Sequence, residues 1–316
     1  MQHRPLGRTG LDVSAIAFNA RGLDARACGD LDLDEAGAAL ALAVDKGVNV
    51  IVSPLDGEAR AATADLLRRS VEGSDLHIVC HAPPLIAHNL PSPHLYADAV
   101  FPAGHLLACV EAALRTFAVE RLALLMLPAW QTEWSKEGAW RQTLQRLKEE
   151  GKIAAFGVAP FDHEPGAARE VVELAAVDCV EVMYNPFDPE AAADLFPACQ
   201  EKGVGVIARS PLYAGAISPG WGEAPFPADD WRASFFYPEH RDETRERVQR
   251  LAADTASLGG TVTETALRFA LSHPAVSTVA IGMRTRAHVE ANLAAAELGP
   301  LDAETLKRLG AHKWLC

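Results

Sequence analysis

Three observations predict an α/β protein whose strands close into a (β/α)8 barrel, the TIM-barrel architecture. Short apolar runs rich in Val, Ile or Leu recur along the chain, which is typical of strands buried on both faces of a parallel sheet. Longer amphipathic segments separate them, giving about eight strand–helix alternations within 316 residues. The turn after the first run, FNARGLDARACG, lacks the G-x-G-x-x-G pattern of an open dinucleotide-binding sheet. A closed barrel is therefore favoured over an open sheet.

The elements of this barrel can be placed in order. The expected strands are Val13–Phe18, Asn49–Val52, His77–His81, Leu122–Leu127, Ala154–Val158, Val180–Tyr184, Gly205–Arg209 and Ser277–Ile281. Amphipathic segments between them predict helices over Asp34–Lys46, His105–Phe117, Trp134–Glu149, Glu164–Ala175 and Pro189–Lys202. Asp188 as N-cap and Pro189 in the first turn mark the start of the last helix. No linker divides the chain, so a single domain over residues 1–316 is expected.

One segment interrupts this alternation. From Tyr213 to about His240 the chain carries Pro, Gly and aromatic residues without a clear period. In a barrel this segment is a long loop after strand 7, on the face where barrel enzymes keep their active sites. Its aromatic residues argue against disorder, because aromatic side chains favour burial.

Charge and cysteine usage restrict the partners. The chain has 29 basic and 42 acidic residues, a net charge of −13, which disfavours nucleic acid and anionic membranes and leaves a small-molecule substrate. No stretch approaches the ~20 continuous apolar residues of a membrane span, and the N-terminus has no apolar signal core. Six scattered cysteines without a CxxC pair fit reduced thiols, so a cytoplasmic location is expected. The oligomeric state is left open.

Several blocks of the sequence resemble aldo-keto reductases, in the family's order and over nearly the whole chain. RPLGRTGLDVS is similar to the family's N-terminal β-hairpin, LKEEGKIAAFGV to the segment leading into strand five, and MYNPFD to strand six. GVGVIARSPLYAG and ADDWR resemble strand seven and its loop, and LRFALSHPAVSTVAIGMRTRAHVEANL the final cofactor-binding region. The resemblance implies a barrel with an N-terminal hairpin and, in an ordinary member, NADPH-dependent reduction of an aldehyde or ketone.

The resemblance also implies a tetrad of Asp, Tyr, Lys and His, and none of these types stands at the matching positions. In that order the positions hold Val52, Gly57, His81 and Pro128. A small gap puts Asp56 or Glu58 at the Tyr position instead, and the whole Asn49–Pro84 stretch contains neither Tyr nor Lys. We therefore expect a divergent member in which this tetrad is lost.

The nicotinamide end of the implied cofactor site is altered too. Ala159, Pro160 and Glu181 stand where the family has Ser, Asn and Gln, and Arg209 replaces its stacked aromatic. The adenosine end matches better, with His288 in place of a Gln. Its matching residues are Ser210, Leu212, Arg284, Thr285 and Asn292. NADP is thus the cofactor expected, if the chain binds any.

Three functions remain open from the sequence. The first is acid–base chemistry without hydride transfer, of lyase, isomerase or hydrolase type, on a small polar substrate, either neutral or anionic. Its candidate catalytic residues are Asp56, Glu58, His81, Glu181 and Arg209. Carboxylates and histidine can move protons near neutral pH, while Arg209 either holds a substrate anion or pairs with Glu181. The second is an NADP(H)-dependent oxidoreductase with a substitute proton donor, and the third is a non-catalytic binding protein. We expect no metal site, because the histidines at 81, 88 and 94 form no compact ligand motif.

Overall fold

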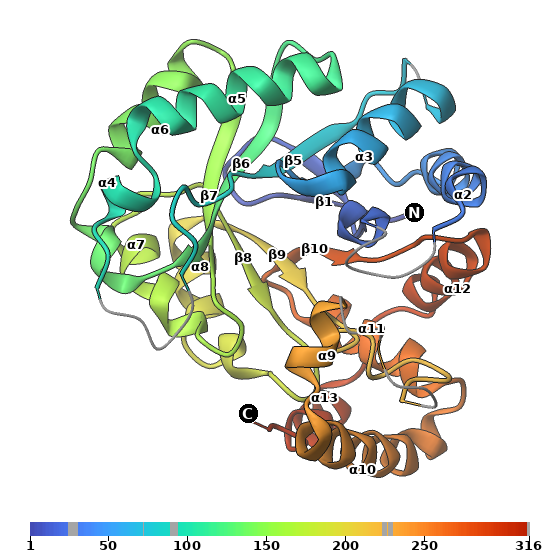
Figure 1. Ribbon diagram of the computed structural model, residues 1–316. Helices are drawn as coiled ribbons and strands as arrows, with labels where there is room; N and C mark the ends of the chain where they lie inside the picture. Colours follow the sequence, from blue (N-terminus) through green and yellow to red (C-terminus); the bar gives the residue numbers. More distant parts are fainter. Residues whose placement is uncertain (25–30, 72, 89–93, 223–225, 227–229, 315–316) are drawn as a thin grey trace.

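The computed structural model describes residues 1–24, 31–71, 73–88, 94–222, 226 and 230–314. Its centre is a closed barrel of eight parallel strands (Figure 1). In order around the barrel these are β3 (Ile16–Asn19), β4 (Val50–Pro54), β5 (His77–His81), β6 (Leu122–Trp130), β7 (Ile153–Pro160), β8 (Cys179–Met183), β9 (Gly205–Arg209) and β10 (Val276–Ile281). The last strand, β10, pairs with both β9 and β3 and so closes the barrel. The predicted (β/α)8 barrel is confirmed.

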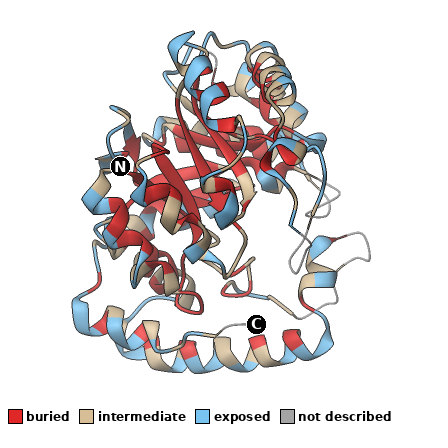
Figure 2. Ribbon diagram, turned by 90° about the vertical axis from the view of Figure 1, so that its left-hand side faces the viewer, coloured by how far each residue is buried: buried red, intermediate tan, exposed pale blue. Residues whose placement is uncertain are grey.

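Helices surround the strands and turn exposed faces outward, while the strands themselves are buried (Figure 2). The α-helices are α2 (Leu33–Asp45), α3 (Gly57–Ser70), α4 (Ala97–Val100), α5 (Ala103–Phe117), α6 (Trp140–Glu149), α7 (Arg169–Glu173), α8 (Leu195–Lys202), α9 (Trp231–Phe235), α10 (Pro238–Thr255), α11 (Val262–Ser272), α12 (Arg286–Glu297) and α13 (Ala303–Gly310). Short 3-10 helices are η1 (Ala20–Leu23), η2 (Thr132–Ser135), η3 (Pro165–Ala168), η4 (Glu190–Ala192) and η5 (Ala256–Leu258). Within the described part of the chain, no helix has both the length and the apolar character needed to cross a membrane.

Side-chain caps fix where several helices begin. The carboxylate of Asp32 accepts two backbone N–H groups at the start of α2, and Asp302 caps α13. Thr261 and Glu264 form a capping box at α11, and the Thr285 hydroxyl caps α12. Each cap satisfies N–H groups that lack a partner within the helix, which stabilises the start by about 1 kcal/mol.

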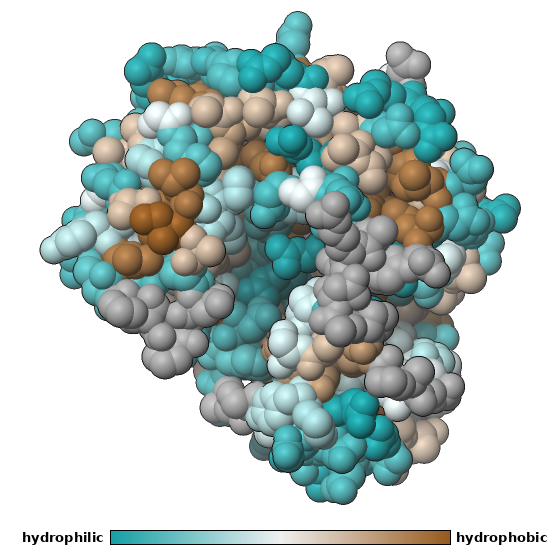
Figure 3. Space-filling model, in the orientation of Figure 1, coloured by the Kyte–Doolittle hydropathy of each residue, from teal (hydrophilic) through white to brown (hydrophobic). Residues whose placement is uncertain are grey.

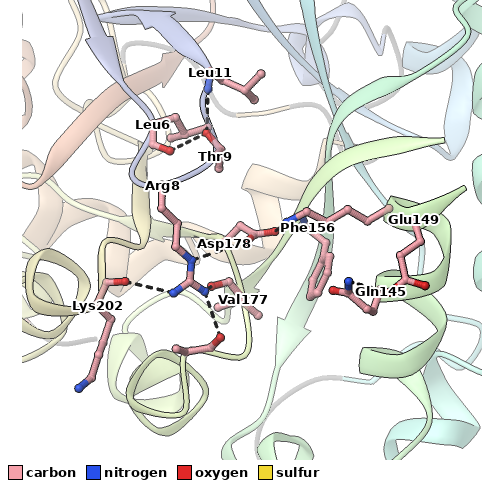
Figure 4. Close-up of polar contacts among 12 residues, drawn as sticks. Leu6, Arg8, Thr9, Leu11, Gln145, Glu149, Phe156, Val177, Asp178 and Lys202 are labelled. Carbon is pink, nitrogen blue, oxygen red and sulfur yellow. Dashed lines mark hydrogen bonds and ion pairs between the residues drawn. The ribbon is translucent and has the colours of Figure 1, made fainter. Parts of the chain in front are cut away.

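The N-terminal hairpin covers the end of the barrel opposite the strand C-termini. It pairs β1 (His3–Pro5) with β2 (Asp12–Ser14) in antiparallel fashion. From its turn, Arg8 donates hydrogen bonds to the carbonyl oxygens of Ala175, Val177 and Lys202, at 3.0, 2.9 and 3.2 Å (Figure 4). Its Nε also lies 3.7 Å from Asp178 Oδ1. These segments precede β8 and β9, so Arg8 anchors the hairpin and leaves the other end of the barrel open.

Several predicted boundaries were wrong. The first predicted strand is split between β2 and β3, and the Trp134–Glu149 helix begins only at Trp140. Asp188 is not an N-cap: helix α8 begins at Leu195 after the short η4. The Asp188 carboxylate is instead buried, with Oδ2 2.9 Å from His163 Nδ1. The contact with His163 therefore replaces the N-cap role that the sequence pattern predicts for Asp188.

The long loop after strand 7 is confirmed, since β9 ends at Arg209 and the next α-helix starts at Trp231. Residues 223–225 and 227–229 of this loop lie outside the described residues, as do Cys28 and Cys316. Phe236 is buried beneath it, 4.8 Å from Trp221 and 5.8 Å from Phe226 between ring centroids. The aromatic residues thus form a local core, as the sequence predicts.

Candidate active site

A cavity of about 1160 Å³ opens at the C-terminal ends of the strands. All eight strands of the barrel contribute lining residues, together with η1, α9, α11 and α12. Figure 3 shows this face hollowed near its centre. Around the hollow, the loop after β9 adds Trp231, Arg232 and Phe235 to the wall. The cavity is large enough for a nucleotide cofactor and a small substrate.

Strand alternation places three polar side chains at the floor of this cavity. Barrel-interior positions on β5, β8 and β9 are filled by the buried apolar residues Val79, Cys179 and Ile207. Because successive side chains point to opposite faces of a strand, the residues two positions later face the same way. These are His81, Glu181 and Arg209, and all three line the cavity.

His81 and Glu181 meet across the barrel. Nε2 of His81 lies 2.8 Å from Oε2 of Glu181, and the two side chains are 19% and 4% exposed. Burial disfavours the charged carboxylate, but the charges of His81 and Arg209 and the hydrogen bond to His81 outweigh it and lower the pKa of Glu181. The other ring nitrogen of His81, Nδ1, has no hydrogen-bond partner among the described residues. This nitrogen is therefore left for a ligand.

Arg209 is held mainly by a residue that the sequence reasoning missed. Its guanidinium forms an ion pair with Asp162, donates a 2.7 Å hydrogen bond to the carbonyl oxygen of Pro160, and lies 3.9 Å from Glu181 Oε1. Burial disfavours the cation, but Asp162 and Glu181 raise the pKa of Arg209. The anion that the sequence requires for Arg209 is thus supplied largely by Asp162, in the loop after β7. That loop has no periodicity that could have pointed to it.

Asp56 and Glu58 differ in position. Asp56 precedes α3, makes no side-chain cap bond and lines the cavity. Glu58 lies in the first turn of α3 and is not among the lining residues. Among the described residues no three His, Cys, Asp or Glu side chains are grouped as metal ligands would be. The cavity's described lining also contains neither Tyr nor Lys.

The predicted adenosine end forms a second region of the same cavity. Ser210, Leu212, Arg284, His288 and Asn292 line it, whereas the Thr285 hydroxyl accepts the His288 backbone N–H at 3.2 Å and caps α12. Asn292 is 7% exposed, and its side-chain amide has no hydrogen-bond partner in the described part of the chain. Because the residue borders the cavity, this amide can bond to a polar ligand such as a nucleotide. Burial, with the nearby Arg284 charge, lowers the pKa of His288.

Comparison with known proteins agrees with this geometry. Residues 24–313 match the family model described as the aldo/keto reductase family. An aldo-keto reductase from Bacillus halodurans, solved in its holo form, superposes with a TM-score of 0.76 at 20% identity, over 100% of this chain and 97% of that one. At that identity the likeness shows the fold alone.

Curated relatives are more similar over shorter stretches. L-galactose dehydrogenase of Arabidopsis thaliana is 31% identical over 173 residues, 53% of this chain and 50% of that protein. Aflatoxin B1 aldehyde reductase member 2 of Homo sapiens is 28% identical over 185 residues, half of each chain. NADH-specific methylglyoxal reductase of Escherichia coli is 27% identical over 108 residues, 32% of each chain. The matched part of this chain spans about half the length of the first two relatives.

These relatives overturn one expectation. Acid–base chemistry without hydride transfer was the first function inferred from the sequence, and it is wrong, because the relatives are named as a dehydrogenase and reductases. Oxidoreduction, the second alternative, agrees with them. The physical error was to take changed side chains at the nicotinamide end as evidence against hydride transfer. The residues expected at the adenosine end, apart from Thr285, line this same cavity.

Proposed function

Because this chain belongs to the aldo/keto reductase family, we propose that it is an NADP(H)-dependent oxidoreductase of a small uncharged carbonyl compound, with His81 as its proton donor. The observation that carries this proposal is the 2.8 Å contact between His81 and the buried Glu181 at the cavity floor. It supplies a histidine–carboxylate pair where the family's Tyr and Lys are expected and absent from the described lining.

The family implies binding of NAD(P)(H), and the cavity has residues that fit it. Asn292 would contact the adenosine end, while Arg284 and His288 provide basic groups for a phosphate there. Ser210 and Leu212, which follow β9, would border the phosphate-bearing middle of the cofactor. When bound, the cofactor supplies or accepts the hydride.

The protein's own part in this chemistry is to hold and move one proton. Glu181 accepts the N–H at Nε2 of His81 and fixes the orientation of the ring, as a carboxylate does beside a catalytic histidine. In reduction, the proton on Nδ1 passes to the carbonyl oxygen; in oxidation, Nδ1 takes it from the alcohol. His81 then exchanges its proton with solvent through the open cavity.

Charge around His81 favours an uncharged substrate. The described cavity wall near this ring carries carboxylates at Asp56, Asp162 and Glu181, against guanidinium groups at Arg21 and Arg209. Arg209 is already paired with Asp162 before any substrate binds. Because Glu181 pairs with His81 and Asp162 with Arg209, neither of these basic groups is left to hold a substrate carboxylate. Sugars and aldehydes, as in the names of the relatives, carry no charge.

A cytoplasmic location is part of the proposal. Among the described cysteines, Cys80, Cys109, Cys179 and Cys199 are free thiols, as a reducing compartment would keep them.

The proposal is tested with two variants that separate cofactor binding from proton transfer. His81→Gln should lower kcat by about 10²–10⁴-fold, the usual contribution of a general acid, and leave the Kd for NADPH within about twofold. Asn292→Ala should weaken NADPH binding about fivefold, the loss of one hydrogen bond, and leave kcat near wild type at saturating cofactor. Fluorescence titration gives Kd, and turnover is followed with methylglyoxal, aliphatic aldehydes and L-galactose as probes.

Either of two results would refute it. Wild-type protein that binds no NADPH or NADP up to millimolar concentration is not an oxidoreductase of this kind. Turnover in His81→Gln equal to wild type would assign the proton to another ionisable group of the cavity lining, such as Asp56.

A further inference from the structure

The carboxylate of Glu181 is contacted on both oxygens. Oε2 lies 2.8 Å from Nε2 of His81, and Oε1 lies 3.9 Å from Nε of Arg209. The remaining charged or titratable groups that act on it are Arg21 from η1 and the buried thiol of Cys179 on its own strand. Arg209 is thus the only buried permanent cation facing Glu181 among the described residues.

The Arg209 side chain is held next to Glu181 by contacts on the other side of its guanidinium group. Asp162 pairs with its NH1 group, and the Pro160 carbonyl oxygen accepts NH2 at 2.7 Å. Asp188 and His163 also interact electrostatically with Arg209, and His163 Nδ1 lies 2.9 Å from Asp188 Oδ2. The Arg209 side chain is only 17% exposed, so its cation is poorly screened by water.

We propose that Arg209, anchored by Asp162, is a positioning residue that keeps the buried Glu181 ionised and thereby sets the pH range in which His81 can serve as proton donor. The role in turnover rests on the proposed function, whereas the control of Glu181 does not. Arg209 acts through Glu181 and touches neither the transferred proton nor the carbonyl.

The electrostatics give the sign of the effect. Burial alone favours the neutral carboxylic acid, and His81 and Arg209 oppose it. Without the guanidinium, part of that opposition is lost and Glu181 binds a proton at higher pH. Protonation of Glu181 weakens its contact with Nε2 of His81, so the acidic limb of the kcat profile follows Glu181 and moves to higher pH.

The test reads Glu181 directly, in full-length protein without cofactor or substrate. The side-chain carboxyl resonances of 13C-labelled glutamate are followed with pH, and the Glu181 signal is identified by its absence in Glu181→Gln. In Arg209→Gln its midpoint should rise by about one pH unit or more, the usual effect of removing a close opposite charge. Arg209→Lys should restore most of the wild-type midpoint. Arg115→Gln, on the exposed surface of α5, is the matched control and should change nothing.

Kinetics then separates this inference from the proposed function. In Arg209→Gln the acidic limb of kcat should move up by a similar amount, with KM little changed. A Glu181 midpoint in Arg209→Gln within about 0.3 units of wild type overturns the inference, whatever the enzyme's activity. A shifted midpoint in a protein that never turns over a carbonyl supports the electrostatic control and refutes the oxidoreductase proposal alone.

If Arg209→Gln does not fold, Arg209→Met provides the second test. It also removes the guanidinium that lies 3.9 Å from Glu181 Oε1, so it should raise the Glu181 midpoint by a similar amount. An unchanged midpoint in Arg209→Met would overturn the inference in the same way.

Discussion

At the scale of single residues, the burial of Glu181 has a consequence for stability as well as for chemistry. Its pKa is lowered in the folded protein, where burial is outweighed by His81 and Arg209. A carboxyl group with a lower pKa in the folded state binds its proton more weakly there than in the unfolded chain. It therefore stabilises the fold above the unfolded pKa of about 4.3, and this contribution is lost as the pH falls through the lower folded value.

Glu181→Gln should remove that contribution. The free energy of unfolding of wild-type protein should fall more steeply than that of Glu181→Gln as the pH is lowered from about 6 to 3, by about 1.4 kcal/mol for each unit by which the folded pKa is depressed. Urea titrations at several pH values measure both slopes. Parallel slopes would mean that the folded protein does not hold Glu181 in its ionised form.

The residues of the cavity floor could be foreseen only in part. His81, Glu181 and Arg209 each lie two positions beyond an interior apolar residue, so strand alternation alone places them at the barrel mouth. The hydrogen bond between His81 and Glu181 forms because closure of the barrel brings β5 opposite β8. The sequence alone does not show this contact. Asp162 follows β7 in an irregular segment, and no sequence period marks it as the partner of Arg209.

At the scale of elements, β7 and β8 approach each other closely at Gly157. Gly157 pairs with Cys179, and a Cβ at position 157 would lie 2.3 Å from the Cys179 carbonyl oxygen and 2.9 Å from Met126 Sδ. The carbonyl belongs to the backbone of a buried strand and cannot turn away. Only glycine allows the two strands that carry Glu181 and the loop of Asp162 to approach this closely.

Gly157→Ala should therefore destabilise the fold by about 3 kcal/mol, the upper range for overpacking a core. Gly104→Ala, in the first turn of α5, meets nothing within 4 Å and should be neutral or slightly stabilising. Denaturant unfolding of both variants measures the difference. Equal stability of the two would show that β7 and β8 can separate without cost.

The elements that the sequence predicted best are those with the strongest local signal. The strands His77–His81 and Gly205–Arg209 coincide with β5 and β9 to the residue, because each is a short apolar run ending at a charged side chain. Asp188 failed as an N-cap because a tertiary partner, His163, competes for its carboxylate. At Asp188, the tertiary contact with His163 outweighs the local propensity of aspartate to cap a helix.

At the scale of the whole molecule, closure ties the two ends of the chain together. Strand β10 pairs with β3, so the first and last barrel strands are neighbours although more than two hundred residues separate them. The cavity is lined by residues from Asn19 to Ala295 and thus by nearly every unit of the barrel. A ligand bound there contacts elements that cannot be removed without opening the sheet. This argues for the single domain over residues 1–316 that the sequence predicts.

Calorimetry can test this prediction. The protein should unfold in one transition whose calorimetric and van't Hoff enthalpies agree, as for a single cooperative unit. NADPH at about 100 times its Kd should move the whole transition upward, by about 2.7 kcal/mol of added stability, because only the closed barrel presents both Asn292 and the strand ends. Asn292→Ala should reduce this shift at the same NADPH concentration, and a variant remote from the cavity such as Arg115→Gln should not. Two transitions, of which NADPH moves one, would instead divide the chain into separate folding units. One of these units would then have to form the NADPH site by itself. This would contradict the lining of the cavity, whose residues come from the whole length of the sequence.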